Sequence, residues 1–494
     1  MRSMMLAALL VTAPATAAQT PQDARLAKIA AAVDAGRMKA TVERLVAFGT
    51  RHTLSSQTDP KRGIGAAVRW SEAEMKKLGL EVLQTCDTVT GRRVPTPTKV
   101  CNALAIQRGT ERPNDVVIIT GHIDSRVSDV MDFTKDSPGA NDDGSGTAAV
   151  MEAARVLSRH KFPGTIVYGV LSGEEQGLLG GKILADYAKA HGWNVIANLN
   201  NDIIGNSCGS DKVCDAKTVR VFSEGPRWQG REALAAQQRS LGGENDSPSR
   251  NISRFLDSLA ERYPEIGLDV MQIWRNDRFG RGGDHTELLN AGYPAVRFSV
   301  AVEDYDHQHQ DLRVARRSCP ALAYDCVPAK QPLVQFGDTI DEMDFNYLAK
   351  VTRLNVAGLA ALASAPPPSD YVQVEGAVST ATTLTWAPQE GDSFSIRWRR
   401  TDANQWQESL MVRRENCPKL QPVTDPAAYV SDNKNELILH VTSQHPCKIA
   451  LPGIRVDDWV FGVSSVSKDG YESPVASAVP GGAFKPYVAP PPKP

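Results

Sequence analysis

The chain has 494 residues, more than one ordinary domain, so two folded units are expected. Its hydrophobic content of 41% and charged content of 23% are typical of soluble globular proteins. The formal net charge of -2 provides no attraction toward nucleic acid or anionic membrane surfaces. The composition therefore argues against nucleic acid as a partner and favours small or peptidic ligands.

Residues 1–18 have the pattern of an export signal. Arg2 is followed by an apolar run over 4–11 and by the small residues Ala15-Thr16-Ala17-Ala18, which predicts cleavage at the end of this segment. A buried first helix is the alternative, and Pro14 disfavours it. No later stretch has the roughly 20 apolar residues of a membrane helix. We therefore expect an exported protein, periplasmic or extracellular, without a transmembrane segment.

Helical and strand patterns alternate over residues 24–364. Helical spacing of apolar residues and short continuous apolar runs mark the expected elements. The helices are expected at 24–33, 41–47, 63–80, 145–160, 177–191 and 250–263, and the strands at 116–120, 165–171, 195–204, 218–222 and 295–300. This alternation predicts a three-layer α/β domain with a mixed, mostly parallel sheet.

The pattern changes after a proline-rich segment over 365–370, which we expect to be an extended linker. Short alternating or aromatic runs at 382–386, 394–398, 436–441 and 459–466 predict an all-β sandwich over 371–483. Its Trp-Ala-Pro, Ile-Arg-Trp-Arg-Arg and Val-Ser-Ser-Val-Ser-Lys-Asp-Gly-Tyr-Glu-Ser segments resemble a fibronectin type III domain. The resemblance implies recognition of a protein, a glycan or a cell surface. The proline-rich tail over 484–494 is predicted to be disordered.

The eight cysteines fall into four pairs that are close in the sequence. In an oxidising compartment this arrangement predicts local disulfides. Zinc binding by cysteine is disfavoured because no pair has the C-x2-C spacing of structural zinc sites. The connectivity stays open. The pairs are Cys86 with Cys101, Cys208 with Cys214, Cys319 with Cys326, and Cys417 with Cys447.

Polar side chains follow the ends of several predicted strands. In Gly121-His122-Ile123-Asp124-Ser125, the aspartate lies on the same side of an extended chain as the histidine and can fix the imidazole tautomer for metal binding. In Asn141-Asp142-Asp143-Gly144-Ser145-Gly146, two adjacent carboxylates repel each other at the start of a helix, a cost that a cation would offset. Taken singly, each segment has an ordinary structural explanation, a satisfied core histidine or a helix N-cap.

Three further segments add ligands of the same kind. Glu174 and Glu175 leave the apolar strand at 165–171, and Asp202 is a lone carboxylate in the strand at 195–204. Burying an unpaired carboxylate costs several kcal/mol, so a cation is expected beside Asp202. His307 and His309 follow the strand at 295–300.

A further pair, Asp284-His285, is expected in a supporting position or in contact with substrate. The segments end at different strands, and open α/β sheets place their sites at such strand ends. Zinc suits mixed nitrogen and oxygen ligands without thiolates. A phosphate site is disfavoured because the Gly-rich loop is acidic and lacks the Gly-Lys-Ser/Thr ending. The conjunction of segments predicts a zinc site.

In order and context, the motifs over about residues 30–360 resemble the co-catalytic di-zinc aminopeptidase family, which includes secreted bacterial leucyl aminopeptidases and is related to glutamate carboxypeptidases and glutaminyl cyclases. The resemblance implies two zinc ions per chain, with Asp142 bridging both and with His122 and Asp202 completing one site. Glu175 and either His307 or His309 would complete the other, and Glu174 would be the general base.

The resemblance also assigns supporting roles. Asp124 would support His122, and Asp143 occupies a position where the family often has a cis peptide bond. The spacing to Asp311 favours His307 as the last ligand, whereas alignment from Tyr305 favours His309. We expect one of these histidines to bind zinc and the other to contact substrate.

The implied reaction is zinc-dependent hydrolysis of a peptide bond next to a free terminus, through hydroxide formed between two metals, with an aminopeptidase expected first. A carboxypeptidase or dipeptidase is the alternative, because terminus preference depends on a few carboxylates or arginines such as Arg281 and Arg297. A glutaminyl cyclase is disfavoured because the complete Asp-Asp-Gly-Ser-Gly loop suggests two metals.

Two other classes of function are disfavoured. Gly205-Asn206-Ser207-Cys208-Gly209 matches the G-x-S-x-G motif of serine hydrolases, but a nucleophile elbow must lead into a helix and this segment runs toward another strand. A non-enzymatic binding protein would have no need of Glu174 as a free base.

Overall fold

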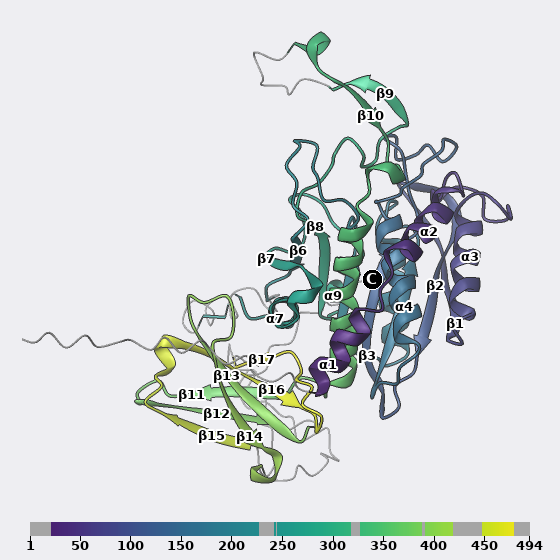
Figure 1. Cartoon of the computed structure of the whole chain (residues 1–494). Coiled ribbons are helices and arrows are strands. Elements are labelled where there is room, and N and C mark those ends of the chain that lie inside the picture. Colours follow the sequence, from purple (N-terminus) through teal and green to yellow (C-terminus); the bar gives the residue numbers. More distant parts are fainter. Residues whose placement is uncertain are drawn as a thin grey trace, which may run out of the picture.

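The computed structural model describes residues 21–226, 242–243, 245–317, 327–387, 391–417 and 447–478. They form an α/β unit and a smaller group of β-strands at the C-terminal end (Figure 1). The predicted signal peptide over 1–18, the strand at 436–441 and the tail over 484–494 lie outside the described residues. Within the described ranges, no helix is both long enough and apolar enough to cross a bilayer.

The α/β unit is built on an eight-stranded mixed sheet with the order β1-β2-β4-β3-β5-β8-β6-β7. The four central strands β4, β3, β5 and β8 run parallel, whereas β2 and β6 join them antiparallel. The strands are β1 (Glu81–Gly91), β2 (Val94–Gln107), β3 (Arg112–His122), β4 (Gly164–Leu171), β5 (Asn194–Asn201), β6 (Thr218–Ser223), β7 (Asp269–Ile273) and β8 (Ala295–Val300).

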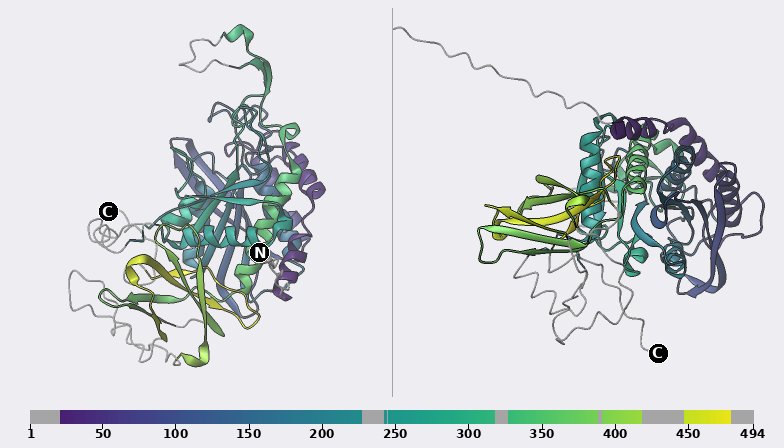
Figure 2. Two further views of the ribbon diagram at one scale, coloured as in Figure 1. Left: turned by 60° about the vertical axis from the view of Figure 1, so that its left-hand side comes forward. Right: turned by 90° about the horizontal axis from the view of Figure 1, so that it is seen from below.

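Helices cover both faces of the sheet, so the predicted three-layer α/β architecture is confirmed (Figures 1 and 2). One face packs against α1 (Pro21–Ala30), α2 (Ala35–Val46), α3 (Ile64–Lys76), α4 (Gly144–Leu157), α7 (Pro248–Arg262) and α9 (Phe345–Ser364). The other face packs against α5 (Leu179–Ala190) and α8 (His285–Asn290). Burial on both faces explains why every residue of β4 is buried and its sequence is nearly all apolar.

The boundaries differ from the sequence-based expectation at informative places. β5 ends at Asn201, so Asp202 lies in the loop after the strand and not within it. The helix expected over 63–80 ends at Lys76, and Gly79 follows with a φ of 77°. Both elements are therefore shorter than predicted: β5 ends before the polar loop that carries Asp202, and α3 ends before the turn at Gly79.

Several elements were not predicted from the sequence. In the hairpin of β1 and β2, β1 is largely exposed and the first half of β2 is mostly exposed and polar, so most of the hairpin lacks an apolar pattern. The second half of β2 has a buried run at 102–106 that was not identified as a strand. Helix α9 is buried almost all around, so its apolar residues show little helical periodicity. Its start is set by Asp344, whose carboxylate accepts hydrogen bonds from the N–H groups of Asn346 and Tyr347.

The C-terminal unit is all-β, as expected. One sheet contains β11 (Asp370–Glu375), β12 (Ala381–Ala387) and β15 (Cys447–Pro452), and the other contains β13 (Ser393–Arg400), β14 (Glu408–Arg413), β16 (Trp459–Val466) and β17 (Ala476–Ser477). The two sheets share a core in which Trp386 packs on Phe394 with ring centroids 5.6 Å apart. The fibronectin type III assignment and the domain boundaries stay predictions.

A separate hairpin of β9 (Arg313–Arg316) and β10 (Leu333–Phe336) projects from the α/β unit (Figures 1 and 2). Short 3-10 helices occupy Pro264–Ile266, Pro328–Lys330, Ile340–Glu342, Arg414–Asn416 and Val456–Asp458.

Three of the four predicted disulfides are confirmed. They join Cys86 to Cys101, Cys208 to Cys214 and Cys417 to Cys447. Cys86 and Cys101 are direct cross-strand partners in the β1–β2 hairpin. The predicted pair of Cys319 and Cys326 lies outside the described residues.

A buried charged contact joins the two units. Arg399 of β13 donates to both oxygens of Asp246, at 2.9 and 2.8 Å, and Ser477 donates to the same carboxylate at 3.1 Å. Arg254 of α7 donates to the carbonyl oxygen of Asn404 at 2.8 Å. The C-terminal sheets therefore lie against α7 through specific polar contacts.

Candidate metal centre

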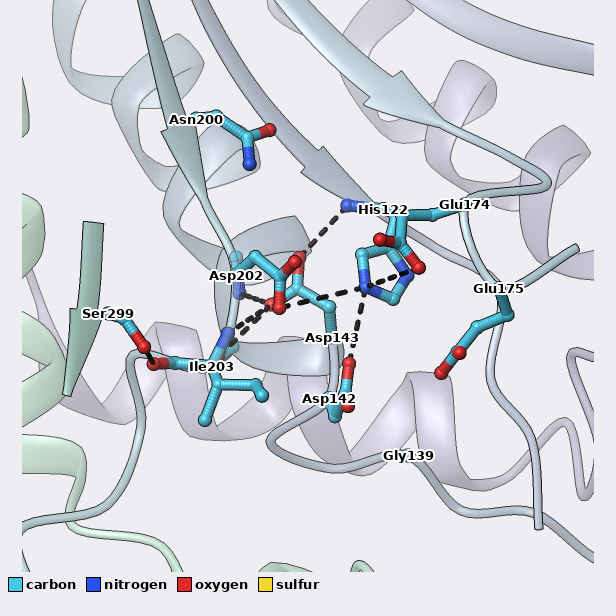
Figure 3. A network of polar contacts seen from close by, with 12 residues as sticks. His122, Gly139, Asp142, Asp143, Glu174, Glu175, Asn200, Asp202, Ile203 and Ser299 are labelled. Atoms are coloured by element: carbon cyan, nitrogen blue, oxygen red, sulfur yellow. Dashed lines mark hydrogen bonds and ion pairs between the residues drawn. The ribbon is translucent and has the colours of Figure 1, made fainter. Parts of the chain in front are cut away.

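Imidazole and carboxylate groups from separate loops converge at the carboxyl end of the central strands (Figure 3). His122 is the last residue of β3 and pairs with Leu171 at the end of β4, so the loops after these strands begin at the same level. The remaining members follow β4, β5 and β8 or precede α4; they are Glu174, Glu175, Asp202, His309 and Asp142. The parallel strands thus bring together residues that are far apart in the sequence.

These side chains form two groups of possible metal ligands. The ligand atoms of His122, Glu174 and Asp202 lie within 4.8 Å of one another, and so do those of Asp142, Glu175 and His309. Asp142 lies between the histidines, with Oδ1 3.2 Å from His122 Nε2 and Oδ2 2.8 Å from His309 Nε2. One carboxylate therefore faces both groups.

The two adjacent glutamates have different surroundings. Glu174 Oε2 lies 4.0 Å from His122 Nε2, and burial raises the pKa of Glu174 well above its ordinary value although the charge of His122 opposes this. Burial acts on Glu175 as well, but the nearby charges of His309 and Arg126 outweigh it and lower its pKa to about 2. Their surroundings therefore make Glu174 the more basic of the two carboxyl groups.

Asp124 has a different partner from the one expected. His122 Nδ1 lies 3.1 Å from the backbone oxygen of Asp124, whereas the Asp124 carboxylate is 3.5 Å away. The carboxylate instead accepts hydrogen bonds from the N–H groups of Gly173, Glu174 and Glu175, at 2.9, 3.2 and 3.1 Å. Asp124 thus orients His122 through its main chain and holds the glutamate loop through its side chain.

Asp143 connects three loops of the site. Its carboxylate accepts hydrogen bonds from the N–H groups of His122 at 2.9 Å, Gly146 at 2.8 Å and Ile203 at 3.3 Å (Figure 3). The contact with Gly146 caps the N-terminus of α4. The peptide bond between Asp142 and Asp143 is cis, as the family resemblance implies.

Asp202 is not unpaired, contrary to the sequence-based expectation. The guanidinium of Arg297 is fully buried and its Nη2 lies 2.8 Å from Asp202 Oδ1. The other terminal nitrogen of Arg297 lies 3.1 Å from Asp277. The expected cation beside Asp202 is therefore present within the protein, on the neighbouring strand β8.

His307 is not brought to the cluster. Its Nδ1 lies 2.7 Å from Asp304 Oδ2, and its Nε2 lies 2.8 Å from the backbone oxygen of Gln335 on β10. It belongs to a separate group with Asp304 and the exposed Glu342. Of the two histidines proposed as the last ligand, His309 is the one that lies beside Asp142 and Glu175.

Asp284 and His285 lie next to the site without joining either group of ligand atoms. Asp284 Oδ1 accepts a hydrogen bond from Gly181 N–H at 2.8 Å, and burial raises the pKa of Asp284 to about 7. His285 Nε2 lies 2.9 Å from the backbone oxygen of Asn276, and burial lowers its pKa. Asp284 thus contacts the start of α5, and His285 contacts the loop that precedes α8.

Two residues of the site had not been identified from the sequence. Asp338 accepts hydrogen bonds from the N–H groups of Asn141 and Asp142, at 2.8 and 2.7 Å, and so holds the loop that carries the shared carboxylate. No local pattern marks Asp338. Arg126 lies four residues after His122, and its Nε contacts Glu175 Oε2 at 2.7 Å.

The contact between Arg126 and His309 determines the histidine tautomer. Arg126 Nη2 lies 2.6 Å from His309 Nδ1. Although burial opposes it, the charges of Glu175 and Asp142 raise the pKa of His309 to about 10, which favours a charged imidazole. The Arg126 contact opposes that charge: a guanidinium can only donate, so in this contact Nδ1 accepts and Nε2 carries a hydrogen toward Asp142 and Glu175. Metal coordination by Nε2 requires loss of that hydrogen and rearrangement of the Arg126 contact.

The donor set otherwise fits zinc. His122 Nε2 is buried without a hydrogen-bond partner within the described residues, which is unusual for a polar atom in a native protein. Because His122 Nδ1 faces a carbonyl oxygen, its Nε2 is left as the acceptor toward the cluster. Imidazoles and carboxylates without thiolates are suitable zinc ligands.

A cavity of about 520 Å³ opens onto the cluster. Its volume falls within the roughly 300–1,000 Å³ of small-ligand pockets. Besides the cluster residues Asp142, Glu174, Glu175, Asp202 and His309, it is lined by Arg92, Arg93, Arg126, Gln176, Gly177, Leu178, Arg278, Gly280, Arg281 and Gly282. The lining is therefore mainly charged.

The serine-hydrolase alternative is not supported by the geometry. Ser207 donates to the Asp344 carboxylate at 2.7 Å, and Cys208 is bonded to Cys214. No helix lies between β5 and β6, a stretch that the structure describes throughout. The segment thus lacks both the helix and the histidine partner that a serine nucleophile needs.

Comparisons with known proteins give a consistent result. A sequence profile of peptidase family M28 matches residues 102–318. A "Probable zinc metalloprotease" of Leptosphaeria maculans is 37% identical over 460 residues, covering 91% of this chain and 95% of the relative. Because so little of the chain is left out, the alignment includes most of the C-terminal unit.

Among solved structures, the LapA aminopeptidase of Legionella pneumophila has a TM-score of 0.48 at 17% identity, covering 73% of this chain and 80% of its own. The glutaminyl cyclase of Porphyromonas gingivalis has a TM-score of 0.44 at 17% identity, covering 66% and 98%. On the strength of the sequence matches, the chain belongs to peptidase family M28 and is a zinc metalloprotease.

Proposed function

We propose that the chain is an exported two-zinc exopeptidase in which Glu174 is the general base. The observation that carries this proposal is the position of Asp142, with one oxygen toward each of the two ligand groups. His122 and Asp202 would hold one ion, and Glu175 and His309 the other. A carboxylate shared in this way is what a pair of closely spaced ions requires.

Zinc ions bound there would polarise the scissile carbonyl and lower the pKa of the attacking water. The protein's own contribution centres on Glu174. Its carboxylate lines the cavity and accepts no hydrogen bond from any other described residue, so it is available to accept the water proton and to deliver it to the leaving amine. Asp124 fixes the position of this base by binding the backbone of its loop.

Two features support action at a chain end. The cavity has the size of a small-ligand pocket, which suits one or two residues of a peptide better than a long segment. The resemblance to di-zinc aminopeptidases favours release of the N-terminal residue. A carboxypeptidase or dipeptidase is the second candidate, because arginines line the cavity and can bind a terminal carboxylate.

Export is supported by the N-terminal pattern over 1–18 and by the three disulfides, which are typical of oxidising compartments. A fusion of residues 1–30 to a reporter enzyme tests it. We expect export of the reporter and cleavage after Ala17 or Ala18, read by N-terminal sequencing. A reporter that stays uncleaved inside the cell would contradict export.

The enzymatic proposal is tested with short peptides whose ends are free, N-acetylated or amidated. We expect a chelator to abolish amino acid release and zinc to restore it, with about two zinc ions per chain at full activity. An aminopeptidase cleaves the amidated peptide and leaves the acetylated one intact, and a carboxypeptidase does the reverse. Cleavage of peptides blocked at both ends would contradict an exopeptidase.

A further inference from the structure

The cavity beside the metal centre is lined by five arginines from three segments of the α/β unit. Arg92 and Arg93 form the turn between β1 and β2, and Arg126 follows β3. Arg278 and Arg281 lie on the loop between β7 and α8, which is referred to below as the arginine loop (residues 274–284). Because β1 and β7 are at opposite ends of the sheet order, positive charge approaches the cavity from both sides.

The arginine loop carries more positive charge than its carboxylate partner balances. Glu303 lies 2.7 Å from Arg281, 2.7 Å from Arg220 and 3.7 Å from Arg278. Three guanidinium groups therefore share one carboxylate. The other carboxylates near Arg278 are Asp277 at 3.1 Å and Asp202 at 4.0 Å, and both are shared with Arg297.

Two of these arginines have hydrogen-bonding capacity to spare. The side chain of Arg278 is only 8% exposed, yet its Nη1 has no hydrogen-bond partner within the described residues. Arg281 is 32% exposed at the cavity wall. A buried donor without an acceptor is unfavourable, and a bound anion would remove this cost.

The turn at Arg92 and Arg93 adds uncompensated charge. Arg93 donates to the backbone oxygen of Glu175 at 2.7 Å, and neither arginine pairs with a carboxylate of the part of the chain that the structure describes. The negative charges in the lining all belong to the metal centre. They are the carboxylates of Asp142, Glu174, Glu175 and Asp202.

The rest of the lining excludes two other kinds of substrate recognition. Leu178 is its only large apolar residue, so the described cavity has no surface for a bulky hydrophobic side chain. Among the described residues, no carboxylate outside the metal centre lines it, so a basic substrate side chain has no acidic partner there. Guanidinium groups match carboxylates in a planar, two-bond geometry.

We propose that this cavity selects substrates by a carboxylate group, which Arg278 and Arg281 bind while Arg92 and Arg93 attract it. The carboxylate belongs to an acidic side chain or to the C-terminus of a short peptide. The inference rests on the proposed peptidase function, because it places the carboxylate next to the scissile bond. It names the substrate class of that same site.

Dipeptides distinguish an acidic side chain from a C-terminus as the source of the carboxylate. Asp-Ala-amide and Ala-Asp-amide are compared with their asparagine counterparts, and Asn-Ala is compared with Asn-Ala-amide. We expect at least one carboxylate-bearing member to be preferred about tenfold or more in kcat/KM, mainly through KM, because a charge-assisted hydrogen bond is lost in its neutral partner. The preference should weaken as salt rises. Equal kinetics in all pairs would overturn the proposal.

Substitutions assign the preference to the arginine loop. Arg281→Gln and Arg278→Gln should lower the ratio between acidic and neutral substrates by roughly tenfold. Arg275→Gln is the matched control, because Arg275 lies on the same loop, packs over Phe279 and does not line the cavity. Arg278 has buried ion pairs, so Arg281, which is partly exposed, provides the variant expected to fold. A ratio unchanged in Arg281→Gln, or lowered equally by Arg275→Gln, contradicts the assignment.

Binding separates this inference from the catalytic proposal. The Glu174→Gln protein is titrated calorimetrically with Asp-Ala-amide, Asn-Ala-amide and Asn-Ala. Tighter binding of a carboxylate-bearing peptide supports the inference even if no hydrolysis is found with the unaltered protein. Hydrolysis without such a binding preference would leave the peptidase proposal intact and overturn this one.

Discussion

The metal centre and the contact between the two units both bury charge, but with opposite sign. At the centre, Asp142, Glu174, Glu175 and Asp202 form an anionic cluster with buried atoms left unsatisfied. At the contact, Arg254 and Arg399 share the carboxylate of Asp246. The excess positive charge there faces tryptophan rings, with Arg254 5.2 Å from Trp274 and Arg399 5.4 Å from Trp406.

The difference distinguishes a binding site from a structural contact. Aromatic faces stabilise the surplus guanidinium groups, so the contact needs no ligand. At the metal centre, Arg297 pairs with Asp202 and Arg126 with Glu175, but within the described residues no guanidinium pairs with Asp142 or Glu174. Metal ions are therefore expected beside these carboxylates. An unbalanced negative cluster is therefore the functional signal, whereas an unbalanced positive one beside aromatic rings indicates structure.

The largest expected effect comes from removing the proposed base. Glu174→Gln should lower kcat about 10²–10⁴-fold, because proton transfer by a positioned carboxylate contributes this much. The zinc content should stay unchanged, since Glu174 is not assigned as a ligand. The measurement is peptide hydrolysis with metal analysis of the same sample. Glu342→Gln, in the separate group with His307, serves as the control. Activity retained by Glu174→Gln would show that Glu174 is not the general base.

Breaking the contact should affect stability and leave catalysis in place. Asp246→Asn leaves Arg399 and Arg254 buried without a counter-ion, which should lower the free energy of unfolding by about 3–5 kcal/mol. Urea unfolding measures this loss. Asp402→Asn, in an exposed pair with Arg400, should change stability by less than about 0.5 kcal/mol. A loss below about 1 kcal/mol in Asp246→Asn would show that the contact does not depend on this pair.

One carboxylate at the contact should make stability depend on pH. Burial raises the pKa of Asp257 from 3.8 to about 6, and its neighbours Gln272 and Gln405 donate only neutral hydrogen bonds. The folded protein therefore binds this proton more tightly than the unfolded chain does. The resulting stabilisation is fully present below the unfolded pKa of 3.8 and is lost as pH rises through about 6. The loss is at most about 3 kcal/mol.

The Asp257→Asn variant isolates this effect from other titrating groups. The difference in unfolding free energy between the unaltered protein and the variant should change across pH 4 to 7, in favour of the variant at the higher pH. A difference that is constant over this interval would indicate that Asp257 is ionised in the folded protein throughout.

The smallest expected effect concerns the support of the metal centre. Asp124→Asn keeps the size of the side chain but replaces an acceptor of three N–H groups, so it should weaken zinc binding or activity about 10–100-fold. Zinc titration against a competing chelator measures this. Asp136→Asn, in an exposed pair with Arg62, is the control. An unaffected Asp124→Asn would mean that the glutamate loop keeps its position without this carboxylate.

The sequence predicted the metal centre better than its surroundings. His122, Asp142, Glu174, Glu175, Asp202 and His309 come together as the pattern of strands and polar loops indicated. Arg126 and Asp338 were not assigned roles, and Arg297 was considered only for terminus preference, because each acts on a partner distant in the sequence or through a backbone group. The pairing of Asp202 with Arg297 shows most clearly what sequence patterns miss, since nothing in the sequence around either residue indicates the other as its partner.

The sequence by itself determined the order of strands and helices in the core of the α/β unit, the polar loops at the strand ends and three local disulfides. These features depend on neighbouring residues, through apolar runs, helical spacing and short covalent loops. Tertiary structure alone decided between His307 and His309, gave Asp124 its backbone partners and brought the five arginines around one cavity. Those outcomes depend on distances between strands that are remote in the chain, and the close packing of the core fixes them.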